Sequence, residues 1–358
     1  MVMETQPYDQ SKADTFAENL LKKFNSAAAT LMISVGHRTG IFDILQDMPP
    51  STSEQIADEG ELNERYVREW LNAMVTSSII VYDKKNATYK LPAEHAGFLT
   101  RNSSPNNMAV IAQFIPVLAY VENDIVKVFK DGGGVPYEAY NRFHDVMSEE
   151  SGQTIVSSLM EHILPLIKGI NKRLEAGVTV LDIGCGYGKA LNLMAGRFPK
   201  SKFYGYDICQ ETVENAQKEA GLKGIQNIMF ERQDLAQWRD TEKFDFITAF
   251  DVIHDQAHPD IVLKNVYNAL KPKGVFLVQD IKASSYVENN IDHILGPLIY
   301  TISCLHCMTV SLSQQGAGLG AAWGEELAED MFEQAGFKNI EKRYLEHDIM
   351  NTYYILRK

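Results

Sequence analysis

A glycine-rich loop directly after a run of β-branched residues is the strongest local signal in the sequence. Residues 178–188 read VTVLDIGCGYG, so Gly184, Gly186 and Gly188 lie between a predicted strand and a predicted helix. Glycines at such a turn let a ligand approach the backbone beside a helix N-terminus. Nicotinamide, flavin and nucleotide sites share this pattern. The loop has no Gly-Lys-Ser/Thr ending, which excludes a phosphate-binding P-loop.

Three carboxylates stand at the predicted ends of three successive strands. Asp182 precedes the glycines, where it would repel a pyrophosphate but attract a ligand that carries an ammonium group. Asp207 comes 23 residues after Gly184, where an acid can accept hydrogen bonds from both ribose hydroxyls. Asp234 ends the next strand, near the expected place of an adenine amino group. Because open α/β sheets bind ligands at this edge, the three acids predict a site for a cationic, ribose-bearing ligand.

A histidine just past the predicted fourth strand could move a proton. The unperturbed pKa of histidine, about 6.5, leaves His254 mostly neutral at cytosolic pH and able to accept one. An alcohol, a phenol or a protonated amine needs such a base before it can attack an electrophile. His254 is therefore a candidate general base, and a histidine that only binds or shapes the substrate is the alternative.

Metal binding is a competing interpretation of the same segment. Asp251, His254, Asp255 and His258 lie within eight residues, with the two histidines at the i, i+4 spacing of helical ligands. Pro259, however, disfavours a continuous helix through this stretch. Cys304-Leu-His-Cys307 is a single CxxC without a second pair, so we interpret it as one face of a pocket helix. We expect no bound metal.

The composition limits the classes of protein in which these residues could act. The 358 residues are 45% hydrophobic and 23% charged, which is typical of a soluble globular protein of two or three domains. The net charge of −13 disfavours binding to phosphate backbones. Four cysteines are too few for a disulfide framework, and residues 1–12 carry no secretion signal, so we expect a cytoplasmic protein. Residues 294–312 lack charge, but their Gly, Pro, His and Ser/Thr favour a buried pocket wall over a membrane span.

The texture of the chain predicts three parts. Residues 1–103 read as helix, turn, helix and hairpin, the pattern of a winged helix, with predicted helices starting after Thr52 (or Ser51) and Asn63. Residues 104–175 are linker helices that cap the site. Residues 176–358 alternate short β-branched runs with helical stretches, which indicates an open α/β sheet, and 281–324 form a lid or substrate insert.

From residue 176 onward the sequence resembles the class I S-adenosylmethionine-dependent methyltransferases. The motifs that carry the resemblance are VLDIGCGYG (180–188), YGYDI (204–208), ERQDL (231–235), FDFITAFDVIHD (244–255) and ALKPKGVFLVQD (269–280). The whole chain is similar to small-molecule methyltransferases on the plant O-methyltransferase plan. It looks closer still to bacterial winged-helix methyltransferases with the motifs GGGVPY (132–137), SGQT (151–154), HDQ (254–256) and GxGLGxxWG (316–324). The implied fold is α/β: a Rossmann-like seven-stranded sheet whose last strand pair is antiparallel, with an N-terminal helical winged-helix domain.

The resemblance also implies a cofactor and its binding residues. S-Adenosylmethionine is the expected cofactor, with its methionine part at the glycine loop, its ribose at Asp207 and its adenine at Asp234. The predicted cofactor-binding residues are Asp182, Gly184, Gly186, Gly188, Asp207, Ile208, Asp234, Leu235 and Phe250. His254 and Asp255 match the catalytic His-Asp pair of the plant enzymes residue for residue. The glutamate that flanks the histidine in those enzymes has no clear counterpart in residues 320–326.

The expected activity is methylation of a small molecule at O, N or S by in-line displacement. The predicted acceptor-lining residues are Tyr137, Tyr140, Phe143, His306 and Trp323. The resemblance implies a homodimer formed through the N-terminal part, and we expect neither nucleic acid nor membrane as partner. One alternative is a regulator that senses S-adenosylmethionine and binds DNA, but residues 1–100 hold 9 Lys/Arg against 14 Asp/Glu. A second alternative is an NAD-dependent oxidoreductase.

Overall fold

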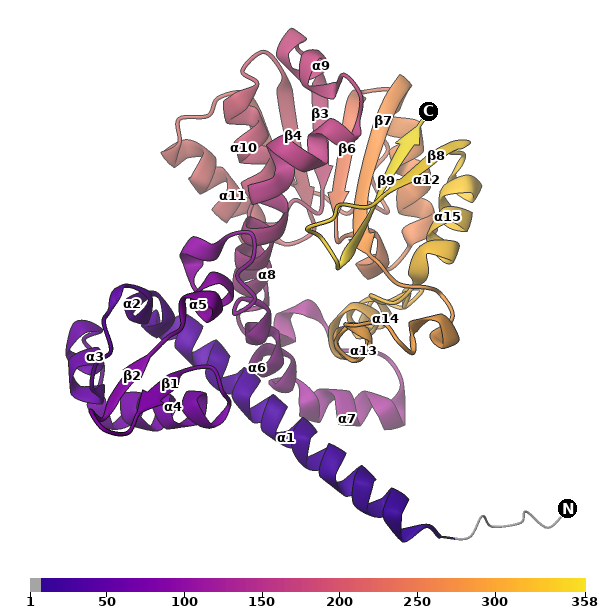
Figure 1. Cartoon of the computed structure of the whole chain (residues 1–358). Helices are drawn as coiled ribbons and strands as arrows, with labels where there is room; N and C mark the ends of the chain where they lie inside the picture. The colour runs from indigo at the N-terminus through magenta and orange to yellow at the C-terminus, as the bar shows by residue number, and fades with distance from the viewer. Residues whose placement is uncertain (1–7) are drawn as a thin grey trace, which may run out of the picture. The chain divides into compact units, whose positions relative to one another are not determined.

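The chain divides between Pro116 and Val117 into two compact units (Figure 1). The computed structural model describes residues 8–358, so most of the segment searched for a secretion signal lies outside the described range. The predicted linker segment, 104–175, falls for the most part in the second unit.

The first unit has the order of elements that a winged helix requires. Its elements are α1 (Gln10–Thr39), α2 (Ile41–Asp47), α3 (Ser53–Glu59), α4 (Glu64–Thr76), β1 (Val81–Asp83), β2 (Thr88–Lys90) and α5 (Ala93–Leu99). The Thr52 hydroxyl accepts a hydrogen bond from the Gln55 backbone, and the Gln55 side chain accepts one from Thr52, so a capping box starts α3. Asn63 caps α4 in the same way, by accepting from the backbone of Arg65. The antiparallel hairpin of β1 and β2 completes the unit.

The charges on α4 bear on the DNA-binding alternative. Arg65 contacts Glu69 at 2.6 Å, and Arg68 contacts Glu64 at 3.2 Å. Both arginines are therefore neutralised by glutamates one turn away on the same helix. A helix that reads a DNA groove presents basic side chains to phosphates instead. This pairing disfavours DNA binding by α4.

The second unit opens with helices and continues into one sheet. The boundary between the units falls within α6 (Phe114–Ala119). The helices that follow are α7 (Glu122–Asp131), α8 (Phe143–Ser151) and α9 (Ile170–Ala176). Two π-helical turns, Gly152–Val156 and Leu159–Ile163, lie between α8 and α9. Within residues 8–358, the large sheet comprises β3 (Thr179–Ile183), β4 (Lys202–Asp207), β5 (Ile228–Arg232), β6 (Phe244–Phe250), β7 (Leu270–Ile281), β8 (Asn339–Arg343) and β9 (Asn351–Arg357). The strand order is β5-β4-β3-β6-β7-β9-β8, parallel from β5 to β7 and antiparallel at β9 and β8. The predicted seven-stranded sheet with an antiparallel last pair is confirmed.

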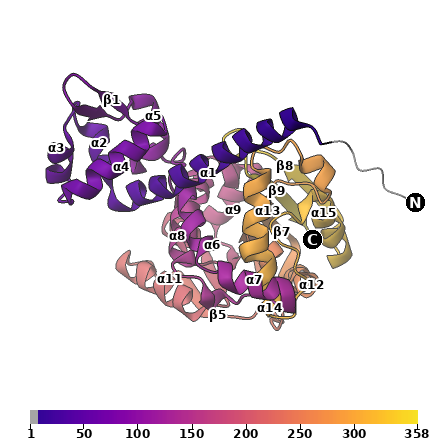
Figure 2. The same ribbon diagram turned by 90° about the horizontal axis from the view of Figure 1, so that it is seen from below.

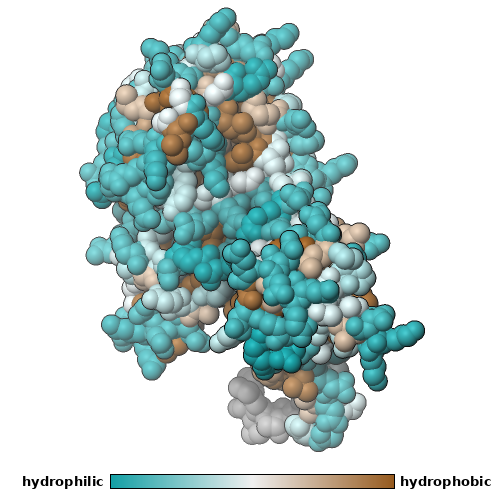
Figure 3. Space-filling model, turned by 90° about the vertical axis from the view of Figure 1, so that its left-hand side faces the viewer, coloured by the Kyte–Doolittle hydropathy of each residue, from teal (hydrophilic) through white to brown (hydrophobic). Residues whose placement is uncertain are grey.

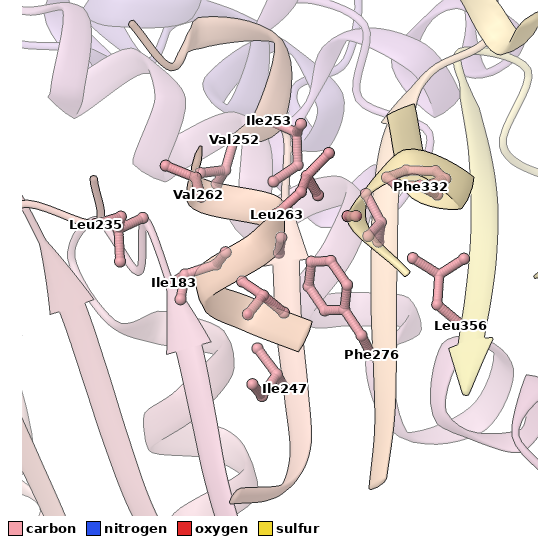
Figure 4. Close-up of a cluster of buried hydrophobic side chains, with 14 of the residues drawn as sticks. Ile183, Leu235, Ile247, Val252, Ile253, Val262, Leu263, Phe276, Phe332 and Leu356 are labelled. Atoms are coloured by element: carbon pink, nitrogen blue, oxygen red, sulfur yellow. The ribbon is translucent and has the colours of Figure 1, made fainter. Parts of the chain in front are cut away.

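Alternate residues of each central strand pack into opposite layers of core. On β3, Leu181 and Ile183 belong to one buried cluster, and Val180 belongs to the other. The period of two is that of a strand buried on both faces. The first cluster lies against α12 (Pro259–Ala269) and α15 (Gly324–Ala335), and Figure 4 shows its side chains between the strands and these helices. The second lies against α9, α10 (Lys189–Arg197) and α11 (Gln210–Leu222). These two layers fix the strand ends that carry the site.

The uncharged stretch 294–312 folds as a broken helix. It forms α13 (Gly296–Ile302), a π-helical turn (Ser303–Cys307) and α14 (Met308–Ser313). Val135, which follows α7 in the chain, donates its backbone N–H to the Thr309 hydroxyl at 2.9 Å, and α7 lies beside α13 and α14 in Figure 2. Among the described residues, no helix is long and apolar enough to cross a membrane. The face of the molecule in Figure 3 is mainly hydrophilic, with only small hydrophobic patches.

Candidate active site

A cavity of about 110 Å³ lies over the glycine loop at the C-terminal end of β3. The predicted cofactor residues that line it are Asp182, Gly184, Gly186, Gly188 and Phe250. Helix α8 supplies another wall, through His144, Met147, Ser148 and Ser151. Lys189 also lines the cavity, and its Nζ donates to the Ser148 carbonyl at 2.9 Å, which ties the two walls together. The loop thus faces a cavity within the second unit.

Asp207 holds the glycine loop from the neighbouring strand. One carboxylate oxygen accepts the backbone N–H of Gly186 at 2.9 Å, and the other accepts that of Cys209 at 2.9 Å. Each oxygen keeps a further lone pair for a ligand, because a carboxylate can accept about four hydrogen bonds. The sequence therefore placed this acid correctly beside the loop, and the backbone bonds fix its orientation.

Asp182 is a buried acid in the cavity wall. Only 3% of its surface is exposed, and its Oδ1 accepts the Thr248 hydroxyl at 2.6 Å. Burial raises the pKa of Asp182 to about 7, against the lowering effect of the Thr248 bond. A cation in the cavity would favour the charged form of this carboxylate, since an opposite charge lowers the pKa of an acid. The wall is therefore suited to an ammonium group.

Two of the loop glycines meet different constraints. Gly186 has φ +51°, and a Cβ built there would meet no described atom within 4 Å. The backbone at Gly186 is thus open to a ligand. Gly188 has φ +68°, and a Cβ there would lie 2.6 Å from the Phe230 ring and 2.8 Å from Ala216. Gly188 is required by packing as well as by conformation.

Replacing Gly188 with alanine is therefore expected to lower the free energy of unfolding by about 3 kcal/mol, about 1 from the positive φ and about 2 from overpacking. Gly224 supplies the matched control, with φ +66° and no described atom within 4 Å of a built Cβ. Gly224→Ala is expected to cost only about 1 kcal/mol. Urea unfolding followed by circular dichroism measures both, and equal losses would contradict the packing assigned to Gly188.

The remaining predicted cofactor residues lie beyond the lining of this cavity. Asp234 accepts the Ala236 backbone N–H at 2.9 Å and the Gln237 side chain at 2.7 Å, which shapes the turn after β5. Ile208 is 46% exposed next to Asp207, and Leu235 is buried in the core. An adenine role for these three residues stays a prediction.

His254 lies in a short 3₁₀ turn (Ile253–Asp255) after β6, between two carboxylates. Its Nδ1 lies 2.6 Å from Oδ1 of Asp280, and its Nε2 lies 3.3 Å from Oδ1 of Asp255. His254 is 3% exposed and Asp280 is 1% exposed. The short contact at Nδ1 fits a ring N–H that donates to Asp280, and Nε2 on the other side of the ring faces Asp255. Both predicted catalytic residues are thus adjacent, and the ring is held in one orientation.

Asp280 is a partner of His254 that the sequence analysis does not predict. It lies near the end of β7, 26 residues from His254 in the chain, and its Oδ1 also accepts the Trp323 indole N–H at 3.1 Å and the Ile281 backbone at 2.8 Å. Its position is the signal that could have identified it, because Asp280 comes at the end of a predicted strand, as Asp182 and Asp207 do. Glu325, in the segment searched for a partner, instead bonds Lys342 and Thr352.

The charges around His254 set its protonation. Burial lowers the pKa of His254, but the Asp280 carboxylate, followed by that of Asp255, outweighs burial and raises the pKa well above its usual range. His306 behaves in the opposite way: burial lowers its pKa to about 4, and Asp255 compensates only in part. The two histidines near Asp255 therefore differ, one favouring the charged form and the other the neutral form.

Aromatic rings surround His306 beside this pair. The His306 ring stacks on Phe143 with centroids 3.6 Å apart, and it meets Tyr137 and Tyr140 edge-on at 5.4 and 4.8 Å. The Tyr137 hydroxyl donates to Oδ2 of Asp255 at 3.2 Å. Four of the five predicted acceptor-lining residues are thus brought together next to His254.

The fifth predicted lining residue, Trp323, is placed differently. It is 3% exposed, packs with Phe332 in the core and reaches the site only through its bond to Asp280. This position does not support a role in lining the acceptor site, because the Trp323 indole N–H donates to Asp280, the carboxylate that contacts His254.

Two family models match the chain. Residues 27–101 match the Rv2258c-like winged HTH domain, and residues 174–341 match a methyltransferase domain. Among curated proteins, the ribosomal protein L11 methyltransferase of Dictyoglomus turgidum is 31% identical over 135 residues, which are 37% of this chain and 40% of that protein. The match therefore spans less than half of that relative.

Solved structures resemble the chain over nearly its whole length. Human N-acetylserotonin methyltransferase in complex with SAM has 17% identity and a TM-score of 0.67, with 99% of each chain covered. The mitomycin 7-O-methyltransferase MmcR has 16% identity and a TM-score of 0.69, covering 98% of this chain and 100% of its own. At such identities the likeness establishes the fold.

Proposed function

We propose that the chain is an S-adenosylmethionine-dependent methyltransferase of small molecules, because residues 174–341 match a methyltransferase domain and residues 27–101 match a winged helix-turn-helix domain. The acceptor atom in this proposal is a hydroxyl oxygen, and His254 is its general base. The observation that carries the proposal is that two features lie at the ends of neighbouring strands. One is the glycine-loop cavity, which has the Asp182 carboxylate in its wall, and the other is His254, which carboxylates hold in place. The complex of the human structural neighbour with SAM supports the choice of cofactor.

The residues around the cavity fit this cofactor. Asp182 offers a buried carboxylate to the ammonium group of the methionine part, and Gly186 leaves open backbone beside it. Asp207 has free lone pairs for the ribose hydroxyls. When bound, S-adenosylmethionine would supply a methyl group on a positively charged sulfur, which is electrophilic.

His254 would take the proton that the acceptor releases. Its Nδ1–H is held by Asp280, so Nε2 would accept the proton that the acceptor hydroxyl gives up on methylation. Asp280 and Asp255 stabilise the imidazolium that results, since both carboxylates lie within ion-pair distance of the ring. A hydroxyl needs this help more than a thiol does, because its pKa is higher; that of a phenol is about 10.

The neighbourhood of His254 favours an uncharged aromatic acceptor. Tyr137, Tyr140 and Phe143 supply apolar ring surface, and the lowered pKa of His306 keeps that ring neutral. Asp255 would repel an anionic acceptor such as a carboxylate. The expected class is therefore a phenol.

The test is a panel of phenols, amines, carboxylates and thiols scored for S-adenosylhomocysteine release. The proposal expects phenols to give the fastest release and carboxylates none above background. Release confined to amines or thiols would overturn the hydroxyl acceptor but keep the methyl transfer. No release with any class, together with no binding of S-adenosylhomocysteine, would overturn both.

The pH profile gives a separate prediction for His254. Only neutral His254 can accept a proton, so kcat/KM should rise with pH, with its midpoint above the ordinary histidine pKa of about 6.5 because Asp280 and Asp255 raise the pKa. Asp280→Asn removes the closest charge and should move the midpoint to lower pH. Asp240→Asn, whose carboxylate pairs with Lys243, is the control and should leave the midpoint unchanged. A midpoint that Asp280→Asn does not move would contradict the assignment.

Self-association through the first unit is part of the proposal. Helix α1 exposes Phe16, Leu21 and Phe24, each at least 60% accessible. Exposed apolar side chains of this size on one helix commonly mark a protein interface. Replacing all three with serine is expected to convert a dimer to a monomer in analytical ultracentrifugation. A wild-type chain that sediments as a monomer at all concentrations would contradict the dimer.

A further inference from the structure

A buried cluster of nitrogen, sulfur and oxygen donors lies on the Nε2 side of His254. One donor atom each from His254, Asp255 and Cys307 lies within 4.8 Å of the other two. His306 lies beside this group but outside it, with its Nδ1 3.9 Å from Oδ2 of Asp255. His254, His306 and Cys307 are 4% exposed or less. The CxxC spacing, taken alone, gave no reason to join Cys307 to His254.

His306 has unused donor and acceptor capacity inside the protein. It is 0% exposed, and within the described part of the chain neither ring nitrogen has a hydrogen-bond partner. A buried polar group without a partner is unfavourable, so such groups are rare and point to a missing ligand. Oδ1 of Asp255 is also buried and, among residues 8–358, accepts no hydrogen bond.

The cluster residues have hydrogen-bond partners of the kind that orient metal ligands in proteins. A histidine that binds a metal through one nitrogen almost always donates its other N–H to a carboxylate or carbonyl. His254 has this partner in Asp280, at 2.6 Å from Nδ1, so its Nε2 is the free donor. Asp255 is oriented in turn by the Tyr137 hydroxyl. The cluster therefore has oriented ligands.

We infer that His254 Nε2, Asp255 and Cys307 Sγ form a binding site for a borderline divalent cation such as Zn²⁺. An imidazole, a thiolate and a carboxylate are all ligands that Zn²⁺ accepts, and a tetrahedral site with three protein ligands leaves its fourth position to water. Donor atoms in such a site lie roughly 3–4 Å apart. The 3.3 Å between His254 Nε2 and Asp255 Oδ1 is close to this spacing.

A second group of possible ligands is less suitable. Donor atoms of Asp251, His254 and Asp280 also lie within 4.8 Å of one another. The nearest nitrogen of His254 in that group is Nδ1, which already bonds Asp280 at 2.6 Å. A metal there would have to break this bond. His258, which the sequence placed in the same candidate cluster, belongs to neither group.

The site would act as an off-switch for the activity proposed above, and this consequence rests on that proposed function. A metal at Nε2 occupies the lone pair that must accept the proton of the acceptor. Binding also displaces the proton of the Cys307 thiol, because the thiolate is the form that binds a metal. The cofactor residues Asp182 and Asp207 are not ligands, so cofactor binding should continue.

Cobalt(II) tests the site directly, since it replaces Zn²⁺ and gives a visible spectrum that Zn²⁺ lacks. Full-length protein with one equivalent of Co²⁺ should show tetrahedral d–d absorption and a thiolate-to-cobalt charge-transfer band, both removed by added Zn²⁺. Cys307→Ser should lose at least about 100-fold in Zn²⁺ affinity. Cys304→Ser is the matched control: Cys304 lies in the same CxxC but outside the donor group, and its variant should keep the full spectrum.

The outcomes separate this inference from the proposed function. Binding of S-adenosylhomocysteine by each variant shows that the variant is folded, and it does not depend on the metal site. A charge-transfer band that survives in Cys307→Ser, or wild-type protein that binds S-adenosylhomocysteine but no Co²⁺, would overturn the metal site and leave the methyltransferase proposal intact. Wild-type protein that binds Co²⁺ but not S-adenosylhomocysteine would do the reverse.

Discussion

Asp207→Ala is expected to weaken binding of S-adenosylhomocysteine at least about 100-fold. In the wild-type chain the Asp207 carboxylate holds the backbone N–H groups of Gly186 and Cys209, both at 2.9 Å. In the proposed complex it would also accept the two ribose hydroxyls. A hydrogen bond to a charged group contributes about 1.5–3 kcal/mol, so losing two such bonds costs about 3 kcal/mol, which is about 100-fold in affinity.

Isothermal titration calorimetry with S-adenosylhomocysteine measures this loss. Asp240→Ala removes an acid of the same domain that pairs with Lys243, and it should bind S-adenosylhomocysteine as the wild type does. Asp207→Asn keeps one acceptor oxygen and should fall between the two. An affinity for Asp207→Ala within threefold of the wild type would remove Asp207 from the cofactor site.

His254→Ala is expected to lower kcat by about 10²–10⁴ without weakening the binding of S-adenosylhomocysteine. This range is typical for the loss of a general acid–base group. Alanine also leaves Asp280 buried without its partner, and an unpaired buried charge can cost 3–5 kcal/mol of stability. His254→Gln keeps an N–H donor for Asp280 and serves as the second variant.

Turnover is measured as S-adenosylhomocysteine release with the best acceptor from the panel. Both variants should lose turnover while calorimetry shows unchanged cofactor affinity, which separates a chemical role from a folding defect. Unchanged turnover in either folded variant would exclude His254 as the base and leave it as a substrate-shaping residue.

The sheet, and the edge at which its parallel strands end, could be predicted because both depend on the local pattern of residue types. The β-branched runs that end in Asp182 and Asp207 mark strands, and parallel strands bring their C-terminal ends to one edge. Thr52 and Asn63 start helices through their own side chains, so their roles could also be predicted from the sequence. Each of these signals needs no knowledge of tertiary contacts.

The partners of His254 could not be predicted in the same way. Asp280 meets His254 only because β6 and β7 are neighbours in register, with Phe250 opposite Gln279, and the sequence does not state which strands pair. Trp323 is expected at the acceptor because aromatic residues suit an apolar chamber, but its indole N–H donates to the buried carboxylate of Asp280. The different burial of the two cysteines in the CxxC motif could not be predicted either, because it depends on a π-helical turn that buries Cys307 more than Cys304.

Titration of the full chain with S-adenosylhomocysteine and, separately, with NADH tests the central claim most directly. The glycine loop alone is compatible with either ligand, but Asp182 in the cavity wall favours an ammonium group over a pyrophosphate. We expect calorimetric binding of S-adenosylhomocysteine that Asp207→Ala weakens at least about 100-fold, with no binding of NADH. Binding of NADH alone would contradict it.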